Sequence, residues 1–420
     1  MKLRYYVLLL SLLVIYTLPG KVCAQIDWEL YDNNPVFDDS HDSEPYEIYQ
    51  PMVLIGDTFH MWYTRKIANG DYENIGYATS PDGLEWTMVN PAVLNPSDDP
   101  ERFDSDNVGQ GTVLWDEGIF KMWYWGDGPN IGNIGYATSG DGIDWTKVDG
   151  SGMDQSVYDR DMDGTGSLAL TTPRVVRIDG TYHMWYSRVH YEEAVFYRIG
   201  YATSPDGLNW TYVPGPGTDG ALLEPGEAGS FDESSVFYPL VVVNDGEFQM
   251  WYAGWDDEFV VRTGYAVSND GVNWSRVVGN GTAGACLDDG ATGTVIRDGD
   301  SYRYWFSSGD MELSLAVSGD QQGISAGSNP LIPGGIELHQ NYPNPFNPTT
   351  QIEFTISHSQ EVQLSVYNIM GQHIEVLAGG CYSAGVHQVQ FDGSKLTNGV
   401  YVCRLVAGEQ VNTVKMLLVK

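Results

Sequence analysis

The sequence predicts an all-β protein, a five-bladed β-propeller followed by a small C-terminal β-sandwich. Three observations support this prediction. The 420 residues include 49 Gly and 20 Pro, and long stretches with helical periodicity are scarce. One aromatic-rich motif recurs five times within residues 25–322. A linker rich in Gly, Ser and Pro follows at 323–335, and the pattern of residues 336–420 is different.

Residues 1–24 have the organisation of a signal peptide. Lys2 and Arg4 provide the positive start, and the apolar run from Val7 to Leu18 is too short for a typical membrane span. The small residue Ala24 precedes Gln25, which fits cleavage between them. We therefore expect export through the periplasm. No later stretch is apolar enough to predict a transmembrane segment.

The chain is strongly acidic, with 56 Asp and Glu against 21 Lys and Arg and a formal charge of −35. Such a surface repels nucleic-acid phosphates and anionic lipid headgroups, so we expect no nucleic-acid partner. Two explanations of the acidity stay open. One is solubility or a saline setting, and the other is binding of divalent cations.

Each copy of the motif predicts one four-stranded antiparallel sheet. A β-branched run comes first, and strands such as Phe59–Tyr63 and Ile75–Ser80 follow. An Asp-Gly turn then leads to a fourth strand at Trp86. A lone sheet of this size cannot bury both faces, whereas stacking copies around an axis places Trp and Tyr between them. The five aromatic strands are Phe59–Tyr63, Phe120–Tyr124, Tyr182–Tyr186, Phe248–Tyr252 and Tyr302–Phe306.

The two ends of the repeat predict that the ring closes. The fifth copy lacks the strand that opens with Trp. Residues 26–37 contain Trp28 followed by Asn34-Pro, as copy one contains Trp86 followed by Asn90-Pro. We therefore expect residues 26–37 to form the outer strand of the fifth blade.

Side chains from different blades converge where the innermost strands enter the central channel. Aligning the copies on their aromatic strands places Gln50, Gly111, Pro173, Pro239 and Gly293 in one column. The segments that approach the channel are 40–50, 103–110, 164–173, 231–238 and 287–293. Residues that all copies share are explained by packing, so we expect a functional site where the copies differ.

Acidic residues that do not recur in these segments are the candidates for catalysis. The predicted catalytic residues are Glu47, Asp106 and Glu233. The predicted substrate-binding residues, from the same segments and the strand that follows, are Arg174, Asp42 and Gln110. A solvated surface position is the alternative for each of them.

The comparison between copies also separates residues with a structural role from candidates for sugar binding. Asp104 and Asp232 both follow a Phe at the same place in two copies, which predicts a structural turn or cap. Aromatic residues that the copies do not share are the better candidates for stacking on sugars. These aromatic residues are Trp125, Trp255, Tyr191, Tyr197 and Phe259.

One acidic loop is a weak candidate for calcium. Asp159, Asp161 and Asp163 alternate and are followed by Gly164, as in a calcium-binding loop, but Leu170 stands where the bidentate acid belongs. An exposed acidic loop is the alternative, and we expect no cofactor to be required. The spacing of the cysteines fits no zinc site, although Cys381 and Cys403 are near enough in sequence to pair.

The C-terminal part resembles the type A sorting domain of type IX secretion substrates. The similarity rests on Gln340-Asn-Tyr-Pro-Asn-Pro-Phe-Asn-Pro348, on Gly399-Val-Tyr401 and on a final strand that contains Lys415. The resemblance implies a small β-sandwich, an interaction with the type IX secretion machinery, and passage across an outer membrane.

The propeller resembles the five-bladed glycoside hydrolases of families 43, 32 and 68 and the related family 130. The similarity rests on the Asn-Pro-Val, Met-Trp-Tyr and Gly-Tyr-Ala-Thr-Ser elements of the blades. It implies a carboxylate base, a tuning Asp and a Glu acid. These roles transfer to Glu47 or Asp42, to Asp106 and to Glu233. The Asp-Pro that this family has in its first inner strand is not found here, and its Arg-Asp-Pro motif is missing too.

The sequence therefore predicts a secreted or surface-bound protein that recognises a glycan. The first hypothesis is a glycoside hydrolase-like protein acting on polysaccharide, because glycoside hydrolysis needs two carboxyl groups that flank the scissile bond. The second is a propeller that binds carbohydrate or mediates adhesion without catalysis. Whether the protein is an enzyme stays open at this point.

Overall fold

The computed structural model describes most of the chain, and nearly all of its elements are strands. The predicted signal peptide, the linker at 323–335 and Asp42 lie outside the described residues, so the predicted domain boundaries stay predictions. The described residues are 26–38, 46–56, 58–67, 73–191, 195–244, 246–290, 292–298, 301–308, 312–318, 336–356, 360–368, 372–382, 385–407 and 410–420.

Five four-stranded antiparallel sheets make up the part of the chain described between residues 26 and 318. The first four sheets run in chain order from the innermost to the outermost strand, as predicted. The first two sheets are β2 (Tyr46–Ile55), β3 (Phe59–Ile67), β4 (Glu73–Ser80), β5 (Thr87–Leu94), and β6 (Asn107–Asp116), β7 (Ile119–Asp127), β8 (Asn133–Ser139), β9 (Trp145–Val148). The next two are β10 (Ala169–Ile178), β11 (Thr181–Tyr191), β12 (Val195–Ser204), β13 (Thr211–Tyr212), and β14 (Ser235–Asn244), β15 (Glu247–Trp255), β16 (Val261–Ser268), β17 (Ser275–Val277).

The fifth sheet joins the two ends of the repeat. It contains β18 (Gly293–Asp298), β19 (Ser301–Ser307), β20 (Leu313–Ser318) and β1 (Glu29–Leu30). Strand β1 pairs with β20, and the Asn34 side chain exchanges two hydrogen bonds with the Leu315 backbone, at 2.9 and 2.8 Å. The prediction that residues 26–37 complete the last sheet is therefore confirmed.

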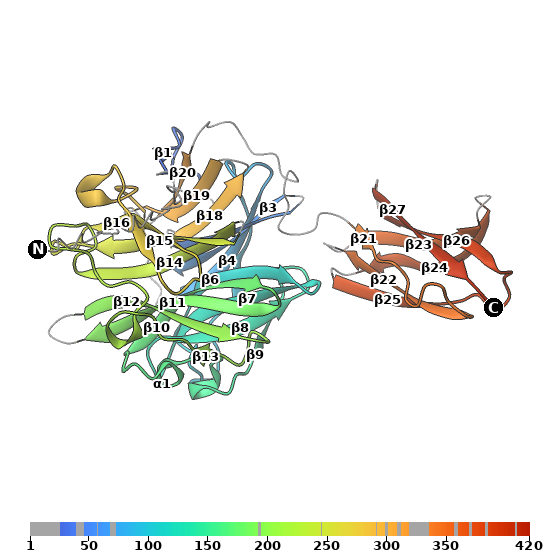
Figure 1. Cartoon of the computed structure of the whole chain (residues 1–420), viewed down its shortest axis with the longest axis horizontal. Helices are drawn as coiled ribbons and strands as arrows, with labels where there is room; N and C mark the ends of the chain where they lie inside the picture. The colour runs from blue at the N-terminus through green and yellow to red at the C-terminus, as the bar shows by residue number, and fades with distance from the viewer. Residues whose placement is uncertain are drawn as a thin grey trace, which may run out of the picture.

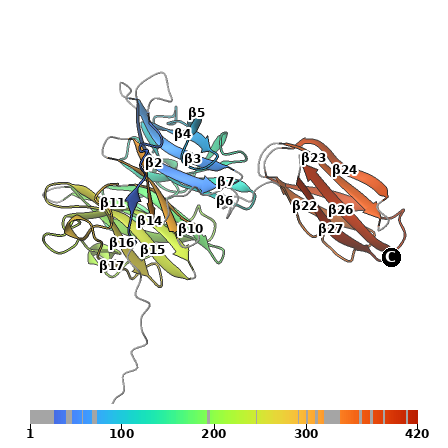
Figure 2. The ribbon, with the colours of Figure 1, turned by 90° about the horizontal axis from the view of Figure 1, so that it is seen from above.

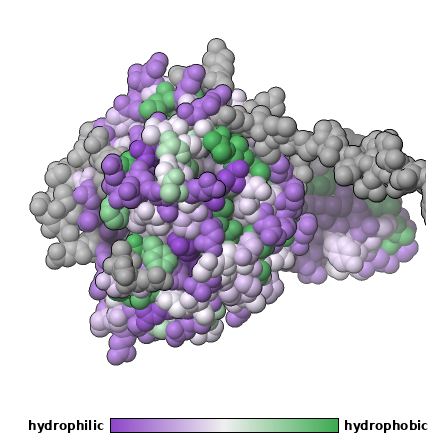
Figure 3. All heavy atoms as spheres, turned by 60° about the vertical axis from the view of Figure 1, so that its left-hand side comes forward, coloured by the Kyte–Doolittle hydropathy of each residue, from purple (hydrophilic) through white to green (hydrophobic). Residues whose placement is uncertain are grey.

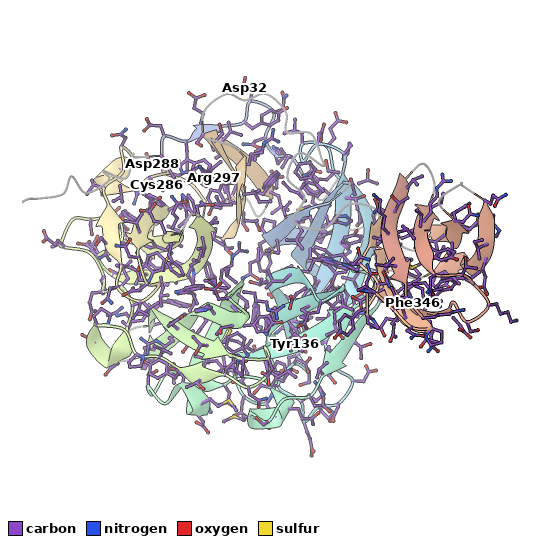
Figure 4. The ribbon with its side chains drawn as sticks, turned by 45° about the vertical axis from the view of Figure 1, so that its right-hand side comes forward. Asp32, Tyr136, Cys286, Asp288, Arg297 and Phe346 are labelled. Atoms are coloured by element: carbon purple, nitrogen blue, oxygen red, sulfur yellow. The ribbon has the colours of Figure 1, made fainter. Side chains whose placement is uncertain are left out.

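The sheets are arranged around an axis (Figures 1 and 4). Each innermost strand contacts the next in the order β2, β6, β10, β14 and β18, and β18 contacts β2 again. Thr112 Oγ1 donates to Pro173 O at 2.9 Å, and Thr294 Oγ1 donates to Pro51 O at 2.8 Å, so equivalent hydroxyls link neighbouring blades. The predicted propeller fold is confirmed.

A repeated Trp–Gly hydrogen bond holds each blade to its neighbour. The indole of Trp123 is fully buried, and its Nε1 donates at 2.8 Å to the carbonyl of Gly207 in the turn of the next blade. The outer-strand Trp210 donates to the same carbonyl at 3.0 Å. The equivalent pairs are Trp62–Gly142, Trp185–Gly271 and Trp305–Gly83.

The fifth sheet is the exception to this pattern. No Asp-Gly turn follows β20 within the described residues, and Trp251 Nε1 is buried there without a partner. The N-terminal Trp28 packs there instead, with its ring 6.2 Å from that of Trp251 and 5.7 Å from that of Tyr304. Ring closure by β1 thus replaces a hydrogen bond with aromatic packing.

The predicted alignment of the innermost strands is wrong at one position. Met52 pairs with Trp62 as Thr112 pairs with Trp123. Pro51, not Gln50, therefore occupies the column of Gly111. The shift has a physical reason, because the turn between β2 and β3 is one residue shorter than its equivalent in the second blade. Ile55 pairs with Phe59, whereas Trp115 pairs with Phe120.

Residues 336–420 form a β-sheet body of their own, in orange and red in Figure 2. One sheet contains β21 (Ile336–Leu338), β22 (Thr349–Ile356) and β25 (Gly385–Asp392). The other contains β24 (His373–Tyr382), β23 (Gln360–Asn368), β26 (Gly399–Ala407) and β27 (Gln410–Leu418). One apolar core joins both sheets, as expected for the predicted sandwich.

The Asn-Tyr-Pro-Asn-Pro-Phe segment fastens the last strand of this body. Phe346 is buried and its backbone N–H donates to Leu417 O at 2.9 Å. The Asn344 side chain accepts from Leu417 N at 2.8 Å. The motif therefore has a packing role within the domain.

The surface fits the acidic composition. In Figure 3 hydrophilic residues cover most of the visible face, and hydrophobic residues gather only in small separate patches. Within the described residues, no helix has the length and apolar character needed to cross a membrane.

We predict that Gly207→Ala destabilises the propeller more than Gly180→Ala. Both glycines have positive φ, +79° and +82°. A Cβ added at Gly207 would lie 2.7 Å from Cζ2 of Trp123. A Cβ added at Gly180 would meet no atom within 4 Å. We expect a loss of roughly 1–2 kcal/mol of unfolding free energy at Gly180, from backbone strain alone. At Gly207 we expect about 1–3 kcal/mol more, because the buried Trp must move.

Urea denaturation followed by Trp fluorescence measures both losses. Equal losses for the two variants would contradict the role given to the Trp–Gly contact.

Candidate functional site

The innermost strands change direction near one end of the channel. Strands β2, β6, β10 and β14 each have a register shift there, and Gln50, Thr172 and Tyr238 have φ of 54°, 49° and 52°. Such bulges re-aim side chains. Gln50 is buried, and its Oε1 accepts from Thr64 Oγ1 at 2.9 Å and from Trp125 Nε1 at 3.2 Å, which links the first two blades.

A group of polar side chains from the first, second and fourth blades lies beside these bulges. We call it the mouth cluster and define it as Tyr49, Glu73, Asn107, Asp127 and Tyr238. Antiparallel pairing explains the assembly, because the end of each second strand lies beside the start of the first strand. Asn107 pairs with Asp127 in this way.

Glu73 is the first residue of β4 and its carboxyl is held by the first blade. The Tyr49 hydroxyl donates to it, and the Glu73 backbone N–H donates to Asn107 Oδ1 at 2.9 Å. Burial raises the pKa of Glu73, and the nearby charges of Asp127 and Glu47 raise it further. The bond from Tyr49 and the charge of Lys66 oppose this shift.

Asp127 ends β7 and is the second carboxyl of the mouth cluster. Its carboxylate accepts from the backbone N–H groups of Gly132 and Gly128 and from the side chain of Asn107. Burial raises the pKa of Asp127 despite these bonds, and the charge of Asp106 adds to the effect. Glu73 Oε2 and Asp127 Oδ1 are buried without a hydrogen-bond partner among the described residues. Each carboxyl therefore has an oxygen left to interact with a ligand.

Two other buried carboxylates, in contrast, have close cationic partners. Asp104 accepts from Tyr124 OH at 2.7 Å and lies 2.6 Å from Lys147 Nζ. Although burial alone would raise the pKa of Asp104, Lys147 and its other partners hold it below the usual value. Asp232 has the same kinds of partner, with Tyr252 OH at 2.9 Å and Arg276 Nε at 2.8 Å. Both residues connect strands within the scaffold, in line with the structural role predicted for them.

Aromatic rings continue from the mouth cluster across the third and fourth blades. Tyr197 lies 5.1 Å from Phe237 and 5.1 Å from Trp255 between ring centroids, and Phe237 lies 4.7 Å from Tyr238. Tyr197, Tyr238 and Trp255 are all partly exposed. Phe259, which is 67% exposed, packs against Trp255 at 5.7 Å. These rings offer flat apolar surfaces of the kind that stack on sugar rings.

The structure places the three predicted catalytic residues at different points. Glu47 is partly exposed, with its carboxylate 3.8 Å from Lys66 Nζ, and its charge acts on Glu73. Asp106 is exposed and its charge acts on Asp127. Glu233 accepts from Gly229 N at 2.5 Å in a loop of the fourth blade. Glu47 and Asp106 thus border the mouth cluster, and no contact connects Glu233 with it.

The predicted substrate-binding residues are also separated. Arg174 lies in a cavity on the axis, lined by the parts of the innermost strands that follow the bulges. Gln110 belongs to β6, and Asp42 lies outside the described residues. Their roles in binding substrate stay predictions.

The acidic loop at Asp159 has local bonding partners. Asp159 caps the short helix α1 (Arg160–Asp163) by accepting from Asp161 N at 2.9 Å and Met162 N at 3.0 Å. Asp163 is buried and accepts from Tyr186 OH at 2.5 Å. Over the ranges that the structure describes, no three His, Cys, Asp or Glu side chains are grouped to hold a metal ion. Calcium at this loop stays a prediction.

The cysteine thiols are not paired as the sequence allowed. Cys403 is buried in β26 with a free thiol, so the candidate pair with Cys381 is not formed. Cys286 also has a free thiol. Figure 4 shows Cys286 beside Asp288, in the loop that precedes β18.

Sequence reasoning missed both carboxyls of the mouth cluster. At the position of Glu73, the next three blades have Gly132, Tyr197 and Val261. At the position of Asp127, the first blade has Lys66 and the fourth has Trp255. Both therefore meet the criterion that a site lies where the copies differ. The search covered only the approach to the innermost strands, although antiparallel pairing brings the ends of the second strands to the same place.

Comparisons with known proteins agree with a propeller of the glycoside hydrolase type joined to a sorting domain. Residues 340–420 match the family described as secretion system C-terminal sorting domain, which confirms the resemblance of the tail. One solved structure superposes with a TM-score of 0.55. It is described with the statement that the GH130 family of mannoside phosphorylases contains glycoside hydrolases that target β-1,2 mannosidic linkages in Candida mannan. It is 20% identical and covers 74% of this chain and 98% of its own.

Two curated relatives extend this comparison to sequence. The uncharacterized protein Rv1502 of Mycobacterium tuberculosis is 31% identical over 230 residues, which are 52% of this chain and 69% of that protein. The chain belongs to the same protein family as Rv1502. The 1,2-beta-oligomannan phosphorylase of Thermoanaerobacter sp. is 27% identical over 173 residues, which are 38% of this chain and 56% of that protein.

We predict that Glu73→Gln stabilises the protein more at neutral pH than in acid. The folded-state pKa of Glu73 is raised above its ordinary value of 4.5, so the folded protein binds the proton more tightly than the unfolded chain does. The wild type therefore loses stability as the pH rises above about 4.5, and the amide variant lacks this loss. Urea denaturation at pH 4 and pH 7 measures the effect. A stability difference between variant and wild type that is constant, or that shrinks toward pH 7, would contradict the buried state of this carboxyl. The variant Glu85→Gln, at an exposed position, controls for the removal of one charge.

Proposed function

We propose that this protein is a secreted, glycan-directed propeller whose mouth cluster is a glycoside hydrolase-like site for polysaccharide. The observation that carries the proposal is the pair of buried carboxyls, Glu73 and Asp127. Each has a raised pKa and one oxygen without a partner among the described residues. Carboxyls with shifted pKa in a concave site are typical of acid–base catalysis.

The proposed chemistry follows from the electrostatics of Glu73 and Asp127. Because burial and the charge of Asp127 raise the pKa of Glu73, this carboxyl keeps its proton to a higher pH than an ordinary Glu does. We assign the proton to Glu73, which donates it to the leaving glycosidic oxygen. Asp127, fixed by two backbone N–H groups, supplies the second carboxylate that the reaction needs.

The tyrosines of the mouth cluster support this assignment. Burial and the nearby Glu73 carboxyl raise the pKa of Tyr49, so its hydroxyl stays protonated and remains a donor. Burial also raises the pKa of Tyr238, so its hydroxyl stays neutral beside Tyr49. The row of aromatic rings from Tyr238 to Trp255 then provides stacking positions for further sugars of the chain.

The relatives suggest which glycans to test first. Mannoside phosphorylases and β-1,2-mannosidases are the activities named for the GH130 structure, and a 1,2-beta-oligomannan is the substrate named for the Thermoanaerobacter protein. We therefore place β-1,2-mannans at the head of a panel that also contains arabinans, xylans and fructans.

The second candidate function is glycan binding or adhesion without catalysis. It is favoured by the separation of Glu233 from the mouth cluster, since the residues that the family resemblance would make catalytic do not converge. In this reading the aromatic row and the free carboxyl oxygens bind the glycan, and no bond is cleaved.

The C-terminal domain supports export by the type IX secretion machinery. We propose that the chain crosses the periplasm and ends outside the cell or on its outer surface. The acidic charge makes a nucleic-acid partner unfavourable there.

We predict that Glu73→Gln lowers kcat by about 100-fold or more on the glycan that is cleaved, because a general acid contributes at least that much. Reducing-end assays on the panel, each with and without inorganic phosphate, measure turnover. Glycan binding by calorimetry should stay within a few-fold of the wild type, since the amide keeps the shape of the carboxyl.

Glu233→Gln is the matched comparison for this test. Loss of turnover in Glu233→Gln with full turnover in Glu73→Gln would move the acid to the fourth blade. Binding without turnover on every glycan, with or without phosphate, would establish the non-catalytic alternative instead.

A further inference from the structure

A cavity lies on the propeller axis, lined by the parts of the innermost strands that follow the bulges. It has a volume of about 420 Å³, and four of the five innermost strands supply most of its lining. Its walls are mostly β-branched and apolar, with Val53, Val175, Val241 and Val295 among the lining residues. Only four polar side chains line it. They are Arg174, Arg297, Asn244 and Thr294.

Arg174 is held in this cavity by weak partners. Its Nη1 lies 2.9 Å from Met52 Sδ, and its Nε donates to Val241 O at 3.4 Å. No carboxylate pairs with it among the described residues. Burial lowers the pKa of Arg174 to about 10, which leaves the guanidinium charged at neutral pH.

The charge of the cavity is opposite to that of the chain. The sequence has 56 acidic and 21 basic residues, yet the described lining contains two arginines and no acid. Arg297, labelled in Figure 4, comes from β18, and Arg174 comes from β10. A charge in apolar surroundings without a partner destabilises a fold, and such charges are normally paired. For Arg174, which pairs with no carboxylate among the described residues, the negative charge is therefore expected from a ligand.

We propose that the axial cavity binds a small oxyanion, a phosphate or a carboxylate, through the guanidinium of Arg174. A guanidinium presents planar pairs of N–H donors that match the oxygens of both groups. The cavity has room for an anion of this size together with water. This site is separate from the mouth cluster and does not depend on catalysis there.

Thermal unfolding of the mature full-length chain without glycan tests the proposal. All 13 Trp lie from Trp28 to Trp305, so Trp fluorescence follows the propeller and not the sorting domain. Sodium phosphate and sodium acetate are compared with sodium chloride at equal ionic strength. We expect at least one oxyanion to raise Tm by about 2–4 °C at saturation, since a ligand that binds only the folded state stabilises it.

The variant Arg174→Met should lose this shift. Without an oxyanion it should melt at or above the wild-type Tm, because an apolar residue replaces an unpaired charge among valines. Arg174→Lys should keep part of the shift, since it retains the charge but not the paired donors.

Arg177→Met is the matched control, because Arg177 lies three residues on in the same strand and is exposed. It should keep the full shift. Equal shifts in the wild type and Arg174→Met, or no shift with either oxyanion, would overturn the proposal. Turnover on the glycan panel does not enter this test, so the two proposals fail independently.

Discussion

The hydrogen bond from a buried tryptophan to the turn of the neighbouring blade is the constraint on which the rest of the propeller depends. Each indole sits between two sheets, and its N–H must find an acceptor there because a buried donor without a partner is costly. The glycine carbonyl of the Asp-Gly turn provides it, as Gly207 does for Trp123 at 2.8 Å. The turn therefore needs both a positive φ and the absence of a side chain.

This constraint also explains how the ring closes. Within the described residues the last sheet has no such turn after β20, so Trp251 lacks its acceptor there, and Trp28 from the other end of the chain covers it. Both ends of the repeat thus share one sheet. The five sheets become one cooperative ring, which fixes the distances between side chains of different blades at the channel.

Buried carboxylates in this scaffold fall into two groups with different consequences. Asp104 and Asp232 are neutralised by nearby cations and tyrosines, so they stabilise the fold. Glu73 and Asp127 have no close cation to lower their pKa enough to offset burial, and each keeps a free oxygen. The mouth cluster is therefore a place where the rigid ring holds two carboxyls in an unfavourable state, which is a common property of catalytic and binding sites.

Much of the fold was predictable from the sequence, because the Met-Trp-Tyr strands and Asp-Gly turns repeat the same packing solution. Even closure by residues 26–37 follows from the missing Trp strand. The site was less predictable, since Glu73 and Asp127 are far apart in the sequence and meet only through the pairing of second and third strands with their neighbours. The bulge at Gln50 and the local bonds of Asp159 depend on backbone geometry that the pattern of residues does not reveal.

The central claim is that the shared residues build the ring while function resides in the mouth cluster, where the blades differ. The crystallographic position of a bound oligosaccharide on the full chain tests this most directly. We predict a sugar within hydrogen-bonding distance of Glu73 and Asp127, with further units along Tyr238 and Trp255. An oligosaccharide bound only at the loop of Glu233, or outside the channel end altogether, would contradict the account.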